Sequence, residues 1–192
     1  MKIAVLALQG DFAEHAEAAE RLGIETLLLR NRRDLLADFD AVILPGGEST
    51  VQSKLLHELD MFDTLREMIL SGKPVMATCA GLILLADRIA EDTARHLATL
   101  DVTVKRNAYG RQLGSFYIEE SFAGSDHVVP MSFIRAPAIE RVGGKVEILA
   151  SFDGKPTAVR QGNQLGMTFH PELQHESTIL EYFIEKVIKG RQ

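Results

Sequence analysis

Residues 75–86, VMATCAGLILLA, decide the fold. The stretch opens with Val75 to Thr78, an apolar run without alternation that follows the chain-breaking residues 72–74, GKP. Such a run predicts a strand buried on both faces of a parallel sheet. From Leu82 to Ile89 the apolar spacing is helix-like. Cys79 is therefore expected at a strand-to-helix turn.

The chain before this stretch alternates between short apolar runs and helical patterns. Residues 12–22 have apolar side chains at helical spacing, and Gly23 suits a C-terminal cap. Ser49 is predicted as the N-cap of a further helix, with Gln52 as its capping-box partner. The other expected elements are strands at 2–8, 24–29 and 40–44 and helical segments at 34–37 and 62–70. The order strand, helix, strand, strand is typical of an α/β fold.

After about residue 98 the hydrophobic pattern becomes alternating, which is typical of β-strands. The expected strands are residues 103–105, 115–119, 128–134, 146–152, 157–160 and 165–169. A helix from about Ser177 to Lys189 closes the chain. No repeat, low-complexity segment or linker interrupts the sequence, so residues 1–192 are expected to form a single domain.

The composition restricts the class of protein. The 192 residues carry 21 Lys and Arg against 27 Asp and Glu, a formal charge of −6, without a basic cluster. This pattern argues against a nucleic-acid binder, so a small molecule or a protein is the expected partner. The longest nearly apolar run, Val75 to Ala86, is shorter than the roughly 18 residues that span a bilayer, and we expect neither a membrane segment nor a signal peptide. One cysteine forms neither an intrachain disulfide nor a Cys-rich metal site, which fits the reducing cytoplasm.

Cys79 is the candidate nucleophile. A thiol at the start of a helix feels the positive end of the helix dipole, which favours the reactive thiolate. Backbone N–H groups at such a turn have no partner within the helix and can bind a developing oxyanion, and Gly81 leaves room for a substrate. The alternative is that Cys79 is a small buried hydrophobic residue. The chemical interpretation therefore requires a base.

The tripeptide His170-Pro171-Glu172 offers that base. Pro171 favours an extended His170, and residues two apart in an extended segment point the same way, so Glu172 is expected to orient the imidazole. A nucleophile, a base and a carboxylate that fixes the tautomer of the base follow the logic of a catalytic triad. The alternative is a capped turn before the last helix.

Residues 45–50, PGGEST, are the third candidate element. A Gly-Gly turn after a strand lets backbone amides approach a bound group, as in oxyanion holes. The alternative is a tight turn followed by a helix cap. The segment lacks the Gly-Lys-Ser/Thr ending of a P-loop and is not a dinucleotide fingerprint, so nucleotide binding is not supported.

Six strings spread over the chain carry a family resemblance. They are residues 6–11 LALQGD with Glu14 and His15, 44–50 LPGGEST, 78–86 TCAGLILLA, 106–112 RNAYGRQ, 133–137 FIRAP and 168–172 TFHPE. Together with the order Cys, His, Glu, they resemble the class I, triad-type glutamine amidotransferases. Within this class they are similar to the glutaminase subunits of pyridoxal 5′-phosphate synthase.

This resemblance implies a three-layer, flavodoxin-like α/β domain with a mixed, mainly parallel sheet flanked by helices. It implies hydrolysis of L-glutamine to L-glutamate and ammonia, with ammonia channelled to a separate synthase subunit that builds pyridoxal 5′-phosphate from pentose and triose phosphates. Cys79 would attack the side-chain amide, His170 would transfer protons and Glu172 would hold His170. No cofactor, metal, nucleic acid or membrane is expected to take part.

The resemblance also implies the substrate-binding groups. Family members take their oxyanion donors from the backbone amides matching Gly47 and Ala80. The residues matching the glutamine site of the family are Gly47, Glu48, Ser49, Arg106, Ile134 and Arg135. A guanidinium fork suits the α-carboxylate of glutamine, which gives the arginines a physical reason.

Three positions refine the resemblance. Ala77 stands where amidotransferases usually have Gly, and Val51 stands where the family usually has a small residue. Ile83 replaces a Gln found in many other amidotransferases and agrees with the vitamin B6 branch.

Other interpretations remain open on the sequence alone. They are an amidotransferase subunit of another pathway, such as imidazole glycerol phosphate synthesis, a noncatalytic protein on the same fold, and a standalone cysteine hydrolase. The adjacent Glu119 and Glu120 point to opposite faces of a strand, so they are not expected to act as a pair. The remaining histidines show no metal-ligand spacing; they are His15, His57, His96, His127 and His175.

Overall fold

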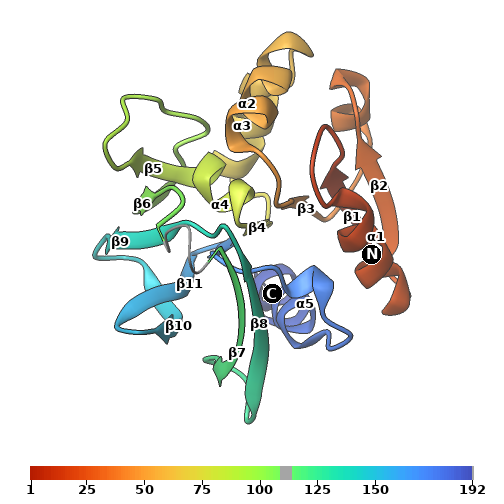
Figure 1. Cartoon of the computed structure of the whole chain (residues 1–192). Helices are drawn as coiled ribbons and strands as arrows, with labels where there is room; N and C mark the ends of the chain where they lie inside the picture. The colour runs from red at the N-terminus through yellow and green to blue at the C-terminus, as the bar shows by residue number, and fades with distance from the viewer. Residues whose placement is uncertain (109–113, 192) are drawn as a thin grey trace.

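A seven-stranded mixed sheet forms the centre of the computed structural model, which describes residues 1–108 and 114–191 (Figure 1). Its strand order is β10-β11-β12-β4-β3-β1-β2. The strands from β12 to β2 run parallel to one another, whereas β11 is antiparallel to both β10 and β12. The bounds are β1 (Lys2–Leu6), β2 (Glu25–Leu29), β3 (Ala41–Leu44), β4 (Val75–Thr78), β10 (Glu147–Phe152), β11 (Lys155–Gln161) and β12 (Gln164–Met167).

Helices and two smaller sheets surround the central sheet (Figure 1). The helices are α1 (Phe12–Arg21), α2 (Ser49–Glu58), α3 (Phe62–Leu70), α4 (Ala80–Leu85) and α5 (Thr178–Tyr182), with 3-10 turns at Arg32–Leu36 and Pro171–Leu173. One smaller sheet has the order β5-β6-β9, and the other is the antiparallel pair of β7 and β8. Their bounds are β5 (Ala86–Ile89), β6 (Leu100–Lys105), β7 (Ser115–Ser121), β8 (Val128–Ile134) and β9 (Ala138–Val142).

Successive residues of the central strands pack into different cores, which explains their uninterrupted apolar sequence. In β1, Ala4 and Leu6 belong to the core that includes side chains of α2, α3 and α4. Ile3 and Val5 belong to the core that includes side chains of α1 and α5. All four are fully buried. The predicted three-layer fold with a mixed, mainly parallel sheet is confirmed.

The helix predicted over Leu82–Ile89 is wrong in its second half. Helix α4 ends at Leu85, and Ala86–Ile89 forms β5, which pairs in parallel with β6. Pairing with a strand distant in sequence overrides the local helical spacing. Strand β9, absent from the predicted strands, pairs antiparallel with the other edge of β6.

Helix α2 begins differently from the prediction. Its N-cap is Glu48, whose carboxylate accepts hydrogen bonds from the backbone N–H groups of Thr50 (3.3 Å) and Val51 (2.9 Å). Ser49 is therefore the first helical residue, and the amide of Gln52 turns inward instead of closing a capping box. A carboxylate suits this position because it meets free N–H donors and the positive end of the helix dipole.

The predicted final helix packs against the central sheet. After α5 the chain stays helical through Phe183–Ile188 and Lys189–Arg191. Ile179 and Phe183 share a core with Met167 of β12. Among the described residues, no helix is both long and apolar enough to cross a membrane.

Candidate active site

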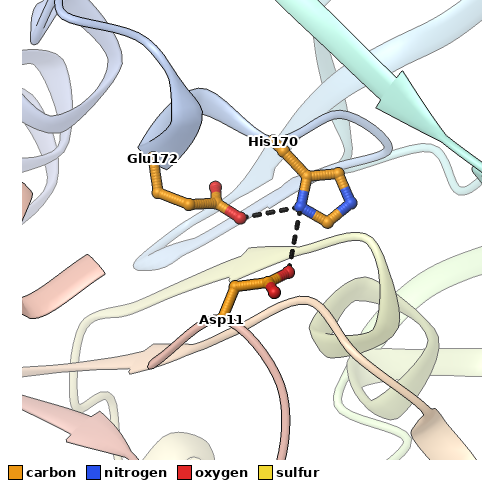
Figure 2. A group of neighbouring side chains, drawn as sticks. All are labelled: Asp11, His170 and Glu172. Atoms are coloured by element: carbon orange, nitrogen blue, oxygen red, sulfur yellow. Dashed lines mark hydrogen bonds and ion pairs between the residues drawn. The ribbon is translucent and has the colours of Figure 1, made fainter. Parts of the chain in front are cut away.

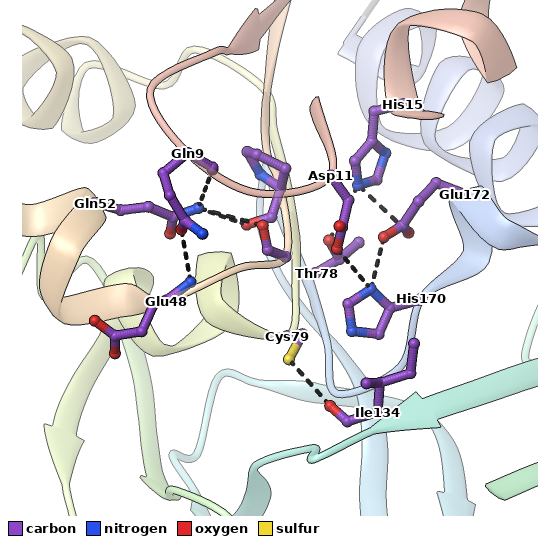
Figure 3. A network of polar contacts seen from close by, with 12 residues as sticks. Gln9, Asp11, His15, Glu48, Gln52, Thr78, Cys79, Ile134, His170 and Glu172 are labelled. Carbon is purple, nitrogen blue, oxygen red and sulfur yellow. Dashed lines mark hydrogen bonds and ion pairs between the residues drawn. The ribbon is translucent and has the colours of Figure 1, made fainter. Parts of the chain in front are cut away.

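Cys79 lies at a sharp turn between β4 and α4. Its backbone has φ 47° and ψ −100°, a conformation that residues with a Cβ rarely adopt. The turn is held by its neighbours, because the Cys79 N–H donates to the backbone oxygen of Met167 in β12 (2.9 Å). A Cβ on Gly81 would lie 2.1 Å from the backbone oxygen of Leu44, so glycine is required there. The turn places the sulfur 4.0 Å from the backbone oxygen of Ile134 (Figure 3).

The three positions that refine the resemblance fit the structure. Ala77 is fully buried and shares a core with Leu44 and Leu82. Val51 is 41% exposed on α2, so its larger side chain meets solvent. Ile83 lines the cavity in front of Cys79.

His170 and Glu172 form a buried acid–base pair beside Cys79 (Figure 3). Nδ1 of His170 lies 2.7 Å from Oε1 of Glu172, and the two residues are 3% and 5% exposed. Burial by itself lowers the pKa of His170, but the neighbouring Cys79 and Glu172 side chains raise it to about 10. Burial raises the pKa of Glu172, but His15 and His170 hold it below its usual value. The pair is therefore favoured as imidazolium and carboxylate.

The two side chains meet by a route that differs from the predicted one. Pro171–Leu173 forms a 3-10 turn, and His170 before it has φ −112° and ψ 86°. The turn, rather than an extended strand, brings the Glu172 carboxylate back to the imidazole. The backbone N–H of His170 donates to the oxygen of Ser132 in β8 (2.8 Å), which ties this segment to the β7-β8 hairpin.

A second carboxylate, Asp11, also faces the imidazole (Figure 2). Its Oδ2 lies 3.4 Å from Nδ1 of His170, and burial raises the pKa of Asp11 despite the nearby His170. One ligand atom each from Asp11, His170 and Glu172 lie within 4.8 Å of one another, a spacing that a metal ion could use. We interpret the group as an acid–base cluster because Nδ1 is already engaged by Glu172 at 2.7 Å. The absence of a functional metal stays a prediction.

The Gly46-Gly47 loop is anchored to the turn after β1. Gly47 has φ 141°, and a Cβ on it would lie 2.5 Å from Oε1 of Gln9, so glycine is required. The same Oε1 accepts a hydrogen bond from the backbone N–H of Glu48 (2.7 Å). The amide of Gln52 donates to the backbone oxygen of Gln9 (2.9 Å) (Figure 3). These bonds determine where the Gly47 backbone lies.

A cavity of about 360 Å³ opens in front of Cys79. Its lining consists of Gln9, Asp11, Gly47, Glu48, Ser49, Cys79, Ile83, Arg106, Asn107, Ile134, Arg135 and His170. The six predicted glutamine-binding residues all belong to this lining, together with the predicted nucleophile and base. Of the other two predicted residues, Glu172 lies behind His170, and Ala80 is the first residue of α4.

The two predicted arginines reach the cavity from the smaller sheets. Arg106 follows β6, forms an ion pair with Asp92 and donates to Oγ1 of Thr50 (3.2 Å). Arg135 follows β8, is exposed and has φ 44°. Both arginines therefore line the cavity from the smaller sheets, whereas Cys79 and His170 line it from the central sheet.

Four polar residues join the site although the sequence analysis gave them no catalytic or binding role. They are Gln9, Asp11, His15 and Gln52 (Figure 3). Two of them could have been found from their position in the sequence. Gln9 and Asp11 follow β1 at the carboxyl edge of the sheet, where α/β folds bind ligands. Residues 109–112 of the string 106–112 lie outside the described residues.

The sheet order and the cysteine turn at the carboxyl end of a central strand define a class I glutamine amidotransferase fold. Residues 5–189 match the SNO glutamine amidotransferase family. The chain belongs to this family.

Relatives of known description agree with this assignment. The chain is 57% identical over 191 residues to a protein of Desulfitobacterium hafniense (strain DSM 10664 / DCB-2) described as "Pyridoxal 5'-phosphate synthase subunit PdxT", covering 100% of this chain and 96% of that one. It is 51% identical over 195 residues to a protein of Streptococcus pneumoniae (strain CGSP14) with the same description, covering 100% of both. A solved structure described as a glutamine amidotransferase superposes with a TM-score of 0.90 at 42% identity, covering 95% of this chain and 97% of the other.

Proposed function

We propose that this chain is the glutaminase subunit of pyridoxal 5′-phosphate synthase. It hydrolyses L-glutamine to L-glutamate and ammonia and supplies the ammonia for pyridoxal 5′-phosphate synthesis from pentose and triose phosphates. The observation that carries the proposal is the cysteine turn: Cys79 faces a cavity together with His170, and Glu172 holds His170 at 2.7 Å. The family and the relatives described above support the same reaction.

The proposed reaction depends on proton transfer by the pair of His170 and Glu172. The Cys79 thiolate attacks the side-chain amide carbon, and the backbone N–H groups of Gly47 and Ala80 bind the oxyanion. His170 gives a proton to the nitrogen, the C–N bond breaks and ammonia leaves a thioester. His170 then takes a proton from water, which attacks the thioester and releases glutamate and the thiolate. Glu172 stabilises the imidazolium in both halves of the cycle.

Glutamine recognition uses the two charged groups on the α-carbon and the side-chain amide. Arg106 and Arg135 provide guanidinium groups for the α-carboxylate, and the Glu48 carboxylate provides an acceptor for the α-ammonium. Ser49 and Ile134 complete the lining next to the reacting amide. Arg106 is already paired with Asp92, so Arg135 is the arginine better able to turn toward a substrate.

The physiological unit in this proposal is a hetero-oligomeric complex. The chain, residues 1–192, acts as one glutaminase domain that binds a pyridoxal 5′-phosphate synthase subunit and channels ammonia to it. The two D. hafniense and S. pneumoniae relatives are themselves described as subunits of that synthase. We place the chain in the cytoplasm because its lone cysteine must stay a reduced thiolate to act.

Glutamate release measured with and without a pyridoxal 5′-phosphate synthase subunit tests this function. We expect release that the synthase subunit stimulates and that Cys79→Ala abolishes. Release that this subunit does not stimulate, but that the synthase of another pathway does, would assign the glutaminase to that other pathway. No release in either condition, with a Cys79 that a glutamine-like electrophile does not alkylate, would favour a noncatalytic protein.

A further inference from the structure

His15 is a buried titratable residue that the mechanism above does not use. It belongs to α1 and is 2% exposed. Its Nε2 lies 3.0 Å from Oγ1 of Thr78 and 3.4 Å from Oε2 of Glu172 (Figure 3). Thr78 immediately precedes Cys79, and Glu172 holds His170. A single side chain therefore contacts Glu172 of the predicted triad and the residue that precedes its nucleophile.

The carboxylate of Glu172 needs a second donor. Oε1 faces His170 at 2.7 Å, whereas Oε2 is buried and has no partner at full hydrogen-bond geometry among the described residues. A buried carboxylate oxygen without a donor is destabilising. Nε2 of His15, 3.4 Å away, is the ring nitrogen beside this oxygen.

These contacts select one tautomer of His15. With its hydrogen on Nε2, the ring donates toward Oε2 of Glu172, and the Thr78 hydroxyl is a second acceptor. With a lone pair on Nε2, two acceptors would face each other at 3.4 Å in a buried site, which is unfavourable. The first tautomer satisfies the carboxylate.

A neutral ring suits this position better than a charged one. Burial lowers the pKa of His15, and this outweighs the opposing effect of the Glu172 carboxylate. His170, Asp11 and Glu14 are the other titratable groups around the ring. A neutral donor steadies the Glu172 carboxylate without cancelling the charge that stabilises the His170 imidazolium.

We propose that His15 is a positioning residue, an inference that rests on the glutaminase function proposed above. As a neutral imidazole with its hydrogen on Nε2, it holds Oε2 of Glu172 so that Oε1 stays on Nδ1 of His170. Its contact with Thr78 ties the same carboxylate to the strand that carries Cys79. His15 is not part of the lining of the substrate cavity, so it acts through its neighbours and not by touching substrate.

The test uses two substitutions of His15 whose side-chain amides differ in length. A cavity of about 20 Å³ behind Glu172 is lined in part by His15, and it has room for about one water molecule. A small apolar residue at position 15 would enlarge this space and let water replace the donor. His15→Gln instead places an N–H near the position of Nε2, whereas His15→Asn is too short to reach Glu172. His175→Asn, at an exposed histidine, is the matched control.

The first measurement is glutamate release by the complex with the synthase subunit. We expect His15→Asn to lower kcat about tenfold to a hundredfold while KM stays within about twofold. His15→Gln should recover most of that loss, and His175→Asn should match the unaltered chain. Equal kcat values for the two His15 variants would overturn the proposal.

The second measurement is the rate of Cys79 alkylation by iodoacetamide as a function of pH, which needs no glutamine turnover. In His15→Asn the carboxylate of Glu172 loses its second donor, so Glu172 ionises at higher pH and His170 loses its proton at lower pH. The pH range over which Cys79 is alkylated rapidly should therefore narrow. In His15→Gln this range should be restored. An unchanged profile in a folded His15→Asn overturns the proposal.

Both measurements separate this inference from the proposed function. If the unaltered complex releases no glutamate, the function fails, and the alkylation profile still decides the role of His15. If His15→Asn does not fold, His15→Gln decides alone: near-normal kcat with a normal profile supports the role, and a large loss of kcat with a normal profile overturns it.

Discussion

The two sides of the substrate cavity differ in burial and in the sheets that carry them. The catalytic wall, formed by Cys79, His170 and Glu172, is between 3% and 7% exposed and follows the central strands β4 and β12. The recognition wall, formed by Arg106, Ile134 and Arg135, lies at the carboxyl ends of β6 and β8 of the smaller sheets, and Ile134 is 40% exposed. Proton transfer requires fixed, desolvated groups, whereas recognition requires side chains that an incoming substrate can reach.

Strand register explains why the catalytic wall is compact. Strand β12 runs parallel to β4, with Met167 paired to Thr78. Cys79 directly follows Thr78, and His170 follows Met167 by three residues. Both therefore leave the sheet at the same edge. Changes in the catalytic wall should act on kcat and changes in the recognition wall on KM, which gives four predictions in order of decreasing size.

Glu172→Gln should have the largest effect. Loss of the carboxylate should lower kcat about a thousandfold or more, because a neutral amide stabilises neither the correct tautomer nor the imidazolium. Stability should change too: the His170 interaction stabilises the fold below its usual pKa of 6.5 and is lost as pH rises through about 10. The lowered pKa of Glu172 has the opposite sign, so its contribution is present above 4.5 and is lost as pH falls through the lowered value.

Thermal unfolding at acid, neutral and alkaline pH measures this change. In Glu172→Gln the pKa of His170 should fall, so the stability lost as pH rises above 6.5 should be smaller and the loss should end at lower pH. Glu147→Gln, at an exposed position on β10, is the control. Unaltered alkaline stability in Glu172→Gln would contradict the assignment of this carboxylate.

Gly81→Ala should break the catalytic wall by steric overlap. The added Cβ would lie 2.1 Å from the backbone oxygen of Leu44, so the backbone must shift. We expect the free energy of unfolding to fall by about 3 kcal/mol and glutaminase activity to fall with it. Gly144→Ala is the matched control, since nothing lies within 4 Å of its added Cβ. Equal denaturant midpoints for the two variants would show that the turn tolerates a side chain.

Arg135→Gln should alter the recognition wall alone. Loss of the guanidinium should raise KM for glutamine about tenfold to a hundredfold and leave kcat within about threefold, because the α-carboxylate lies away from the reacting amide. Steady-state glutamate release in the complex measures both constants. Arg141→Gln, which removes a surface arginine paired with Asp101, should change neither. A drop in kcat at unchanged KM would contradict this prediction and show that Arg135 acts in catalysis and not in substrate binding.

Asp11→Asn should give the smallest effect because Asp11 is the more distant of the two carboxylates that face the imidazole. Its Oδ2 is 3.4 Å from Nδ1 of His170, which Glu172 already holds at 2.7 Å. We expect kcat to stay within about fivefold and the alkaline limb of the rate profile to move to lower pH, since one of two carboxylates near the imidazolium is lost. A loss as large as that of Glu172→Gln would make Asp11 the partner of His170.

The sequence analysis predicted the parts of the fold that depend on neighbouring residues. The buried runs at 2–8, 40–44 and 75–78 predict central strands because a strand covered on both faces has no polar face to alternate with. The turn at Cys79 is predictable for the same reason. The Gly-Gly loop is predictable because two adjacent glycines after a strand favour a turn, although the atoms that exclude a side chain there belong to the distant residues Gln9, Asp11 and His170.

Tertiary structure decided the features whose partners are distant in sequence. Residues 86–89 form β5 because β6 lies beside them, although their own spacing is helical. Glu48 rather than Ser49 caps α2, while Gln52 turns toward Gln9. Local patterns describe a chain segment on its own, whereas these outcomes depend on which segments the folded sheet brings together.

The same division applies to the site. Sequence and family resemblance together selected Cys79, His170 and Glu172, and the structure brings these three side chains together. Only the fold revealed that His15 of α1 contacts Glu172 and that Asp11 faces His170. The physical reason is that a buried carboxylate must find its donors among whatever the fold places beside it, and α1 packs beside the carboxyl edge of the sheet 157 residues earlier in the chain than Glu172.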